Sequence, residues 1–222
     1  MNGRKQKASE ANVFKALCLE KMFVQKGEKR PRLRLAGFEG DWIIGTGKEI
    51  FEVTNDRGYP ELPVLSATQD QGMVIRDDTV KTVSHNIENE TTYKRVLPRQ
   101  FVIHLRSFQG GFAHSRVAGI TSPAYTIMKF KDESLHDDIF WKYVLTSKHF
   151  VRQLELITYG IRDGRSIGFS GFSELVFCFP DKKEQSAIGK FFEDLDKVIE
   201  LQAKKVEKLH HIKAGCLERM FG

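Results

Sequence analysis

The residues with the clearest chemical potential are the cations of an acid-free segment. Between Thr91 and Lys131 the sequence holds no Asp or Glu, while seven Lys and Arg side chains give this stretch a charge of +7. His104 and His114 lie in the same stretch. Such a segment suits the phosphates of a nucleic acid, because cations that neutralise phosphates release bound counterions. The alternative is that these cations pair with acids of neighbouring segments once the chain folds.

No catalytic motif accompanies these cations. The Gly-Thr-Gly-Lys-Glu run at 45–49 lacks the spacing of a phosphate-binding loop, and the sequence has no GxGxxG, GxSxG or HExxH. The Asn/Asp-Pro-Pro-aromatic tetrapeptide of amino-methyltransferases is also missing. His210 and His211 are neighbours on a predicted helix, so their side chains point about 100° apart and cannot chelate one metal ion. We therefore expect no active site and no metal site.

Composition and charge suggest a cytoplasmic protein with no membrane segment. The 222 residues are 41% hydrophobic and include 17 Phe, which is enough for a real core. No apolar run approaches the roughly 20 residues that span a bilayer, and the N-terminus lacks the apolar region of a signal peptide. Three scattered cysteines form no disulfide or zinc pattern. The net charge of +6 comes from residues 1–34, which carry +7, so it does not by itself establish DNA binding.

Helical periodicity predicts a helix near each end of the chain. The first covers 8–24, with Ser9 as its N-cap, and a linker follows at 24–32. The second runs without proline from Asp181, a suitable N-cap, to 221, and about 38 residues give a rod of roughly 55–60 Å. Such a rod is too long to pack along its whole length on a domain of this size.

Part of this second helix should therefore pair with another helix as a coiled coil. Its apolar residues recur at steps of three and four, although an ordinary core stripe would also have this spacing. The predicted helix-pairing residues are Ile188, Phe191, Leu195, Ile199, Val206, Leu209, Ile212, Cys216 and Met220.

The region between the two helices has an α+β pattern. Short β-branched and aromatic runs dominate 43–130, helical spacing follows over 135–159, and a glycine-rich loop is expected at 160–171. A buried strand at 175–180 closes the unit. We expect a curved or barrel-like sheet with flanking helices. The predicted organisation is a helix stub and basic linker (1–34), a globular domain (35–180) and a long helix (181–222).

The ends of the two predicted helices repeat each other. Residues 14–23 are FKALCLEKMF and residues 212–221 are IKAGCLERMF, with seven of ten positions identical. The copies start 198 residues apart, which is too far for a short-period solenoid. The chain therefore looks like one unit of a longer pattern, in which a helix end precedes each globular unit.

The stretch from Pro180 to Phe221, with its Glu184-Gln185 and Leu195-Asp196 pairs, resembles the conserved region of type I restriction–modification specificity (S) subunits. Upstream, 119–125 is similar to the Ser-Pro-x-Tyr strand entry of the target recognition domains of that family, and 165–180 to the stretch that closes such a domain. Arg99-Gln100 stands where the family often has Gly-Asp. The matching C-terminal residues are Pro180, Glu184-Gln185, Ile188, Leu195-Asp196, Ile199 and Leu217 to Phe221.

The resemblance implies a half-subunit with one target recognition domain. Such a chain would be a non-catalytic subunit that reads one half of a bipartite site in double-stranded DNA. Methyltransferase and restriction subunits would be its partners, and S-adenosylmethionine, ATP and Mg²⁺ would belong to them, so this chain would bind no cofactor. It could dimerise through its long helix on a symmetric site. The competing reading is a coiled-coil adaptor that never touches DNA.

Within this reading, side-chain chemistry selects the DNA contacts. Base edges are read by Arg, Lys, Asn, Gln and Ser, so we expect base contacts from the loop around 106–109 and from 162–165. Lys94, Arg95 and Arg99 are expected to hold phosphates. A solvent-facing loop charge is the alternative for each residue. The predicted DNA-binding residues are Lys94, Arg95, Arg99, Arg106, Ser107, Gln109, His114, Arg116, Arg162 and Arg165.

Overall fold

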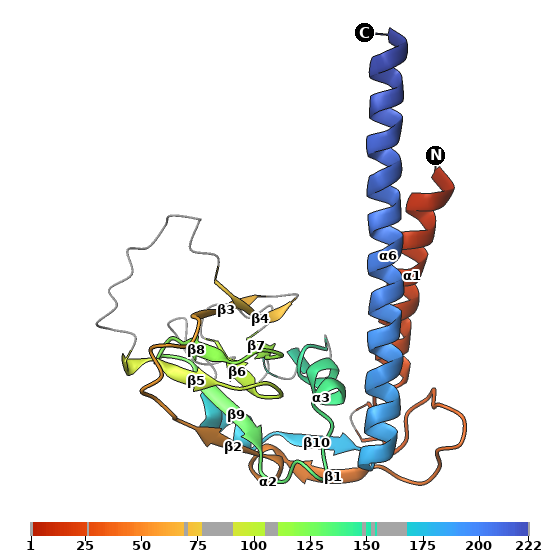
Figure 1. Cartoon of the computed structure of the whole chain (residues 1–222). Coiled ribbons are helices and arrows are strands. Elements are labelled where there is room, and N and C mark those ends of the chain that lie inside the picture. The colour runs from red at the N-terminus through yellow and green to blue at the C-terminus, as the bar shows by residue number, and fades with distance from the viewer. Residues whose placement is uncertain are drawn as a thin grey trace.

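A mixed α+β domain carries a long helix that rises from its base, with a second helix alongside (Figure 1). This is a computed structural model, and it describes residues 2–25, 27–68, 71–76, 91–104, 111–147, 150–151, 154 and 168–221. The predicted α+β class and long C-terminal helix are confirmed. No helix within these ranges is long and apolar enough to cross a membrane.

The described chain holds five helices and ten strands, and in it the strands β2 to β9 follow one another without an α-helix between them. The helices are α1 (Asn2–Lys21), α2 (Gly47–Ile50), α3 (Asp138–Leu145), α5 (Phe169–Ser173) and α6 (Lys182–Phe221). The strands are β1 (Ile43–Thr46), β2 (Phe51–Thr54), β3 (Leu65–Thr68), β4 (Gly72–Ile75), β5 (Lys94–Val96), β6 (Phe101–Ile103), β7 (Phe112–His114), β8 (Gly119–Thr121), β9 (Thr126–Phe130) and β10 (Val176–Phe179).

The strands form short antiparallel ladders that contribute to two hydrophobic clusters. The largest sheet has the order β2-β9-β6-β7, and three two-stranded ladders pair β1 with β10, β3 with β4 and β5 with β8. Isolated bridges link these ladders: Val64 with Ile120, Met73 with Ser115, and Arg57 with Lys94. The β-structure is therefore divided among four short sheets that isolated bridges connect.

The pairing of β1 with β10 places both helices at the same end of the domain. Ile43 lies opposite Phe179, so the first and last strands of the domain are neighbours. The chain thus enters and leaves the domain at one place. As a result α1 and α6 lie side by side, with their free ends pointing the same way, and the two helices run antiparallel (Figure 1).

An aromatic core joins the sheet to the helices. Phe51, Phe140, Trp141 and Phe172 are completely buried and contact one another edge-on or tilted. Burying one such ring removes 150–250 Å² of surface from water, so this cluster dominates the packing energy. Phe192 of α6 is equally buried, which anchors the start of the long helix in the same core.

Local structure departs from the sequence expectation at three places. Helix α1 begins at Asn2, so Ser9 is an interior residue rather than an N-cap; good helix formers at 4–8 extend the helix. The expected loop at 160–171 gives way to α5 from Phe169 onward. Residues 47–50 form a single helical turn, because Thr46 and Glu49 make a reciprocal capping box.

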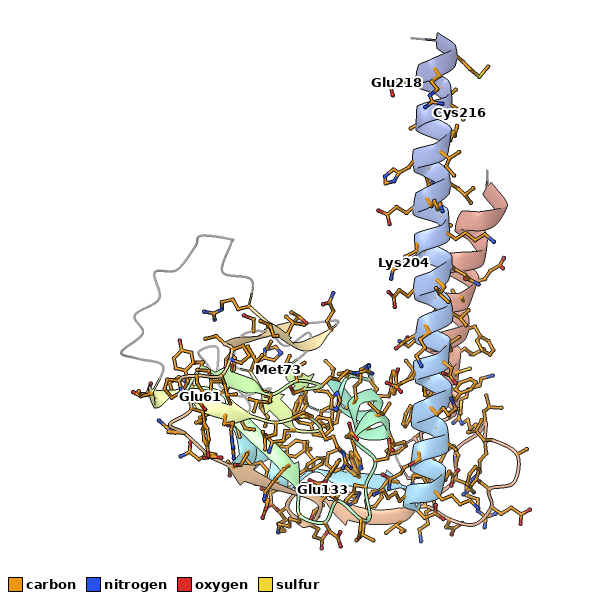
Figure 2. All side chains as sticks on the ribbon, viewed as in Figure 1. Glu61, Met73, Glu133, Lys204, Cys216 and Glu218 are labelled. Atoms are coloured by element: carbon orange, nitrogen blue, oxygen red, sulfur yellow. The ribbon has the colours of Figure 1, made fainter. Side chains whose placement is uncertain are left out.

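Helix α6 has the expected cap and length. The Asp181 carboxylate accepts a hydrogen bond of 2.9 Å from the Glu184 backbone N–H, which confirms the N-cap. Its 40 residues correspond to about 60 Å. The predicted pairing stripe divides along this length: Ile188 is buried in the core, whereas Met220 is 73% exposed. Figure 2 shows Cys216 on the part of α6 that extends past α1.

Candidate nucleic-acid interface

Arg34 and Glu184 fasten the start of α6 to the segment that follows α1. The guanidinium donates two hydrogen bonds to the carboxylate, Nε to Oε1 at 2.8 Å and Nη2 to Oε2 at 2.7 Å. It also donates to the backbone carbonyls of Glu39 and Gly40. The Glu184 side chain is only 3% exposed. This acid of the C-terminal motif is therefore a junction residue, and the linker bearing Arg34 packs against the domain.

Gln185 fastens the other side of the same junction. Its amide group donates to the carbonyls of Pro180 (2.8 Å) and Leu135 (3.2 Å), and its carbonyl accepts from the Asp137 backbone N–H (3.0 Å). The residue is completely buried. It thus holds the segment before α3 against the first turn of α6, so the Glu-Gln pair fixes the helix direction relative to the domain.

Asp196 lies further along α6 and links this helix to both α1 and α3. It accepts a hydrogen bond of 2.7 Å from the Tyr143 hydroxyl on α3 and pairs with the Lys15 ammonium on α1. Burial and this carboxylate both raise the pKa of Tyr143, so its hydroxyl stays a donor. The Leu-Asp motif therefore positions the helix pair against the domain.

The predicted phosphate-binding residues at β5 are engaged within the domain. Lys94 Nζ donates to the Tyr125 carbonyl at 2.7 Å, and burial, with a smaller effect from Arg57, lowers the pKa of Lys94. Arg95 pairs with Asp56 and lies 4.0 Å from the centre of the Tyr59 ring. Both cations already have partners, so any phosphate contact would add to or replace these bonds.

Arg99 and His114 meet at one acid on α3. The Asp138 carboxylate accepts from Arg99 Nε at 3.0 Å and lies 2.8 Å from His114 Nε2. Burial would raise the pKa of Asp138, but the hydrogen bonds and charge of these two residues outweigh it and hold the pKa below its usual range. Arg99 also pairs with Glu133. His114 is buried, whereas Arg99 keeps a partly exposed side chain.

Arg116 reaches from the domain to the long helix, where it pairs with Glu193. Its side chain is 58% exposed despite this bond. Beside it a cleft of about 570 Å³ opens between the domain, α1 and α6. Basic and neutral polar side chains lining the cleft include Lys15, Gln71, Arg116, Lys142, Thr146 and Ser147, and its acids are Asp196 and Glu200.

Lys142 is the most constrained cation of this cleft. Burial lowers its pKa, and the nearby Arg116 charge lowers it further. Its ammonium lies 4.9 Å from the centre of the neighbouring Tyr143 ring. A phosphate entering the cleft would face two clustered cations, Arg116 and Lys142, with hydroxyl donors nearby. Opposite charges from Asp196 and Glu200 limit how strongly the described part of the cleft attracts an anion.

The alternative of internal ion pairs is observed for Arg95, Arg99, Arg116 and Lys129, the last of which pairs with Glu52. The DNA contacts of Lys94, Arg95, Arg99, His114 and Arg116 stay a prediction. The remaining predicted residues lie outside the described residues: Arg106, Ser107, Gln109, Arg162 and Arg165.

Sequence reasoning predicted His114 and Arg116 of the cleft wall but missed others. Lys15 had a signal, because it belongs to the repeated helix end, and Asp196 belongs to the Leu-Asp motif. Lys142 of the wall and Glu193, the partner of Arg116, had none, since each is one charge among many on an amphipathic helix. Their proximity to Arg116 depends on how α3 and α6 pack.

Comparison with known proteins places the fold. No protein-family model and no curated protein matches the chain. The HsdS subunit from Thermoanaerobacter tengcongensis has a TM-score of 0.59 at 14% identity, over 91% of this chain and 47% of that one. A chain from a study of complex assembly and conformational transition of a type I R-M system has a TM-score of 0.60 at 14% identity, over 97% of this chain and 53% of that one. The type I restriction–modification S subunit from M. genitalium has a TM-score of 0.54 at 12% identity, over 99% of this chain and 55% of that one.

The chain has the fold of half an S subunit. It spans about half the length of each solved structure, while nearly all of its own length is matched. The matched part therefore includes both the domain and most of the helical region. At these identities the likeness concerns the fold alone.

Proposed function

We propose that the chain is the DNA sequence-specificity module of a type I restriction–modification system. It reads one half of a bipartite site and contributes no catalytic group. One observation carries this proposal: nearly the whole chain, from α1 to α6, follows the fold of half an S subunit. The module works in the cytoplasm, where the DNA and its partners are.

Catalysis belongs to the partners. Methyltransferase subunits dock on the module, flip the target base and methylate it with S-adenosylmethionine. A restriction subunit that uses ATP and Mg²⁺ cleaves the DNA. This chain determines which DNA sequence is recognised. Side chains of the domain contact base edges in the DNA groove, and cations contact the DNA phosphates.

The long helix serves as a spacer. Glu184, Gln185 and Asp196 fix its direction relative to the domain through the contacts described above. Two chains paired through α6 would hold two domains at a set separation. A two-fold pair reads a palindromic site with an unread spacer, because protein symmetry is matched by DNA symmetry.

Methylation mapping tests the proposal directly. The chain is co-expressed with its methyltransferase subunit, the complex is purified, and methylated sites in the host DNA are sequenced. We expect one interrupted motif, absent when the chain is omitted. Methylation by the isolated chain, or a complex whose methylation pattern does not depend on the chain, would contradict the proposal.

Variants outside the described residues test the predicted base contacts. The R106A/R165A double variant should weaken DNA binding by the assembled complex at least tenfold and relax the recognised motif. R30A/K48A is the matched control, because it removes two exposed cations, each paired with an acid. Equal affinity of both variants would show that the site assignment is wrong.

The adaptor reading has one observation in its favour, namely that Arg95, Arg99 and Arg116 are already paired with acids. Salt dependence separates the two functions. A DNA-reading module loses affinity steeply between 50 and 200 mM salt, because counterions are released on binding. An adaptor would bind its protein partner and show no DNA affinity at either salt concentration.

A further inference from the structure

The two copies of the repeated helix end have opposite environments. Cys18 in α1 and Met22, which directly follows α1, are each 2% exposed. The identical residues at the end of α6 are on the surface: Cys216 is exposed and Met220 is 73% exposed. The same sequence is thus buried once and left uncovered once. The first copy shows what kind of surface this sequence fits.

That surface lies where α3 meets the first half of α6, and we name its four residues, Phe140, Tyr143, Phe192 and Asp196, the helix-end slot. Phe23 stacks on Phe192 at a centroid distance of 5.8 Å and tilts against Phe140 at 5.6 Å. The slot therefore offers an aromatic floor to the end of α1.

One charge pair fixes the register of α1 on the slot. The Lys15 ammonium pairs with Asp196 and lies 5.4 Å from the centre of the Tyr143 ring. Lys15, Cys18 and Met22 follow one another at helical steps of three and four, so they share one face of α1. A ligand of the slot is thus a helix with this spacing of Lys, Cys and Met, ending in Phe.

The end of α6 has the same ligand sequence. Lys213, Cys216, Met220 and Phe221 stand at the same spacing as Lys15, Cys18, Met22 and Phe23. This end cannot reach the slot of its own chain, because Ile212 follows Asp196 by sixteen residues in a continuous helix, about 24 Å along the axis. Figure 2 places Cys216 and Glu218 beyond the free end of α1. Only another chain can offer this end a slot.

We propose that residues 212–221 of α6 bind the helix-end slot of a second copy of this chain, where they replace residues 14–23 of that copy. Lys213 then pairs with Asp196 of the second copy, as Lys15 does within one chain. The exchange is reciprocal, so the two α6 helices run antiparallel and each ends on the domain of the other chain. In the single chain the end of α1 occupies the slot. The more stable this internal contact is, the weaker the dimerisation of two chains should be.

This inference rests on the proposed pairing of two chains, and it does not require DNA binding. Identical substitutions at equivalent repeat positions test it. K213E weakens the α6 end as a ligand and should raise the dimer Kd at least tenfold, measured by sedimentation at micromolar concentrations. K15E weakens the competing α1 end and should lower the dimer Kd several-fold. M220D should act like K213E without disturbing the fold, because Met220 is exposed in the single chain.

Thiol labelling gives an independent readout. With rising protein concentration, alkylation of Cys216 should slow while alkylation of Cys18 accelerates, as mapped by mass spectrometry of the full chain. Pairing in which Cys18 stays protected, or K15E and K213E effects of the same sign, would overturn the exchange. So would a chain that remains monomeric throughout. A chain that directs methylation yet shows any of these results would retain the proposed function and lose this inference.

Discussion

At the scale of single residues, two buried polar groups control the junction and the core. Arg34 and Glu184 form a buried bidentate pair that bridges 150 residues of sequence. His136 lies among Phe130, Trp141 and Phe179, where its Nδ1 accepts from the Trp141 indole N–H at 3.3 Å. Both the Arg34–Glu184 pair and the Trp141–His136 hydrogen bond make testable contributions to stability.

R34A should destabilise the fold by about 3–5 kcal/mol, because it leaves the Glu184 carboxylate buried without its charge partner. Denaturant unfolding measures this loss. R32A is the matched control: Arg32 pairs with Glu28 in an exposed i,i+4 arrangement, which is worth about 0.5 kcal/mol or less. Similar losses in the two variants would contradict the junction role of Arg34.

Stability should fall as the pH drops from about 6.5 to about 4, partly because of His136. Burial lowers the pKa of His136 from 6.5 to about 4 in the folded protein. Between these pH values His136 binds a proton in the unfolded chain but not in the folded chain. The contribution of neutral His136 to stability is therefore complete above pH 6.5 and is lost progressively as the pH falls toward 4. The loss amounts to roughly 3 kcal/mol at most, since one pKa unit is worth about 1.4 kcal/mol.

The H136Q variant separates the effect of His136 on the pH dependence of stability from the titration of carboxylates. Glutamine can accept the Trp141 hydrogen bond through its carbonyl but has no charge to gain. The free energy of unfolding of H136Q should therefore decline less between pH 6.5 and 4 than that of the native chain. Parallel pH profiles would show that His136 does not titrate as expected.

At the scale of elements, the β3–β4 hairpin depends on close contact with β7. Gly72 begins β4 with a φ of +76°, and a Cβ atom there would lie 2.2 Å from the His114 carbonyl oxygen. Only glycine satisfies both the left-handed backbone and this approach. The contact fixes the hairpin beside the cleft, whose wall includes Gln71 and Gly72.

G72A should cost about 2 kcal/mol or more of stability, because it combines left-handed strain with a clash against backbone. Thermal unfolding and amide exchange on β4 and β7 would measure the effect. G171A is the control: Gly171 lies in α5 with open space around its Cβ position, so alanine there should be neutral or slightly stabilising. A neutral G72A would mean that the hairpin can shift away from β7.

At the scale of the whole molecule, one end of a long rod is fixed and the other is uncovered. The first half of α6 is held by α1, α3 and the domain core, whereas Leu201, Ile212 and Met220 are 66%, 52% and 73% exposed. An apolar stripe of this kind on a helix 40 residues long is typical of pairing with another helix.

The native chain should therefore be a dimer or larger species by light scattering at micromolar concentration. The V206D/L209D double variant, which places charges in the stripe beyond the core, should be monomeric. Its far-UV circular dichroism should match that of the native chain, since neither residue belongs to the domain core. A strictly monomeric native chain would rule out self-pairing.

The sequence alone predicted what depends on neighbouring residues. The Asp181 cap, the length of α6 and the β10 strand follow from local capping and periodicity, and each is present in the structure. The start of α1 was misplaced because Ser9 offered a cap that the preceding helix formers overrode. Local rules are strong where an element begins at a cap and weaker where propensity extends it.

Only the tertiary structure decided where the charges go. The acid-free segment has its acids elsewhere in the chain: Arg116 meets Glu193 and Arg99 meets Asp138, 77 and 39 residues away. The repeated helix ends show the same limit. Their sequences nearly coincide, yet Cys18 is buried and Cys216 is exposed, because burial depends on the surface that a helix end reaches and not on its own residues.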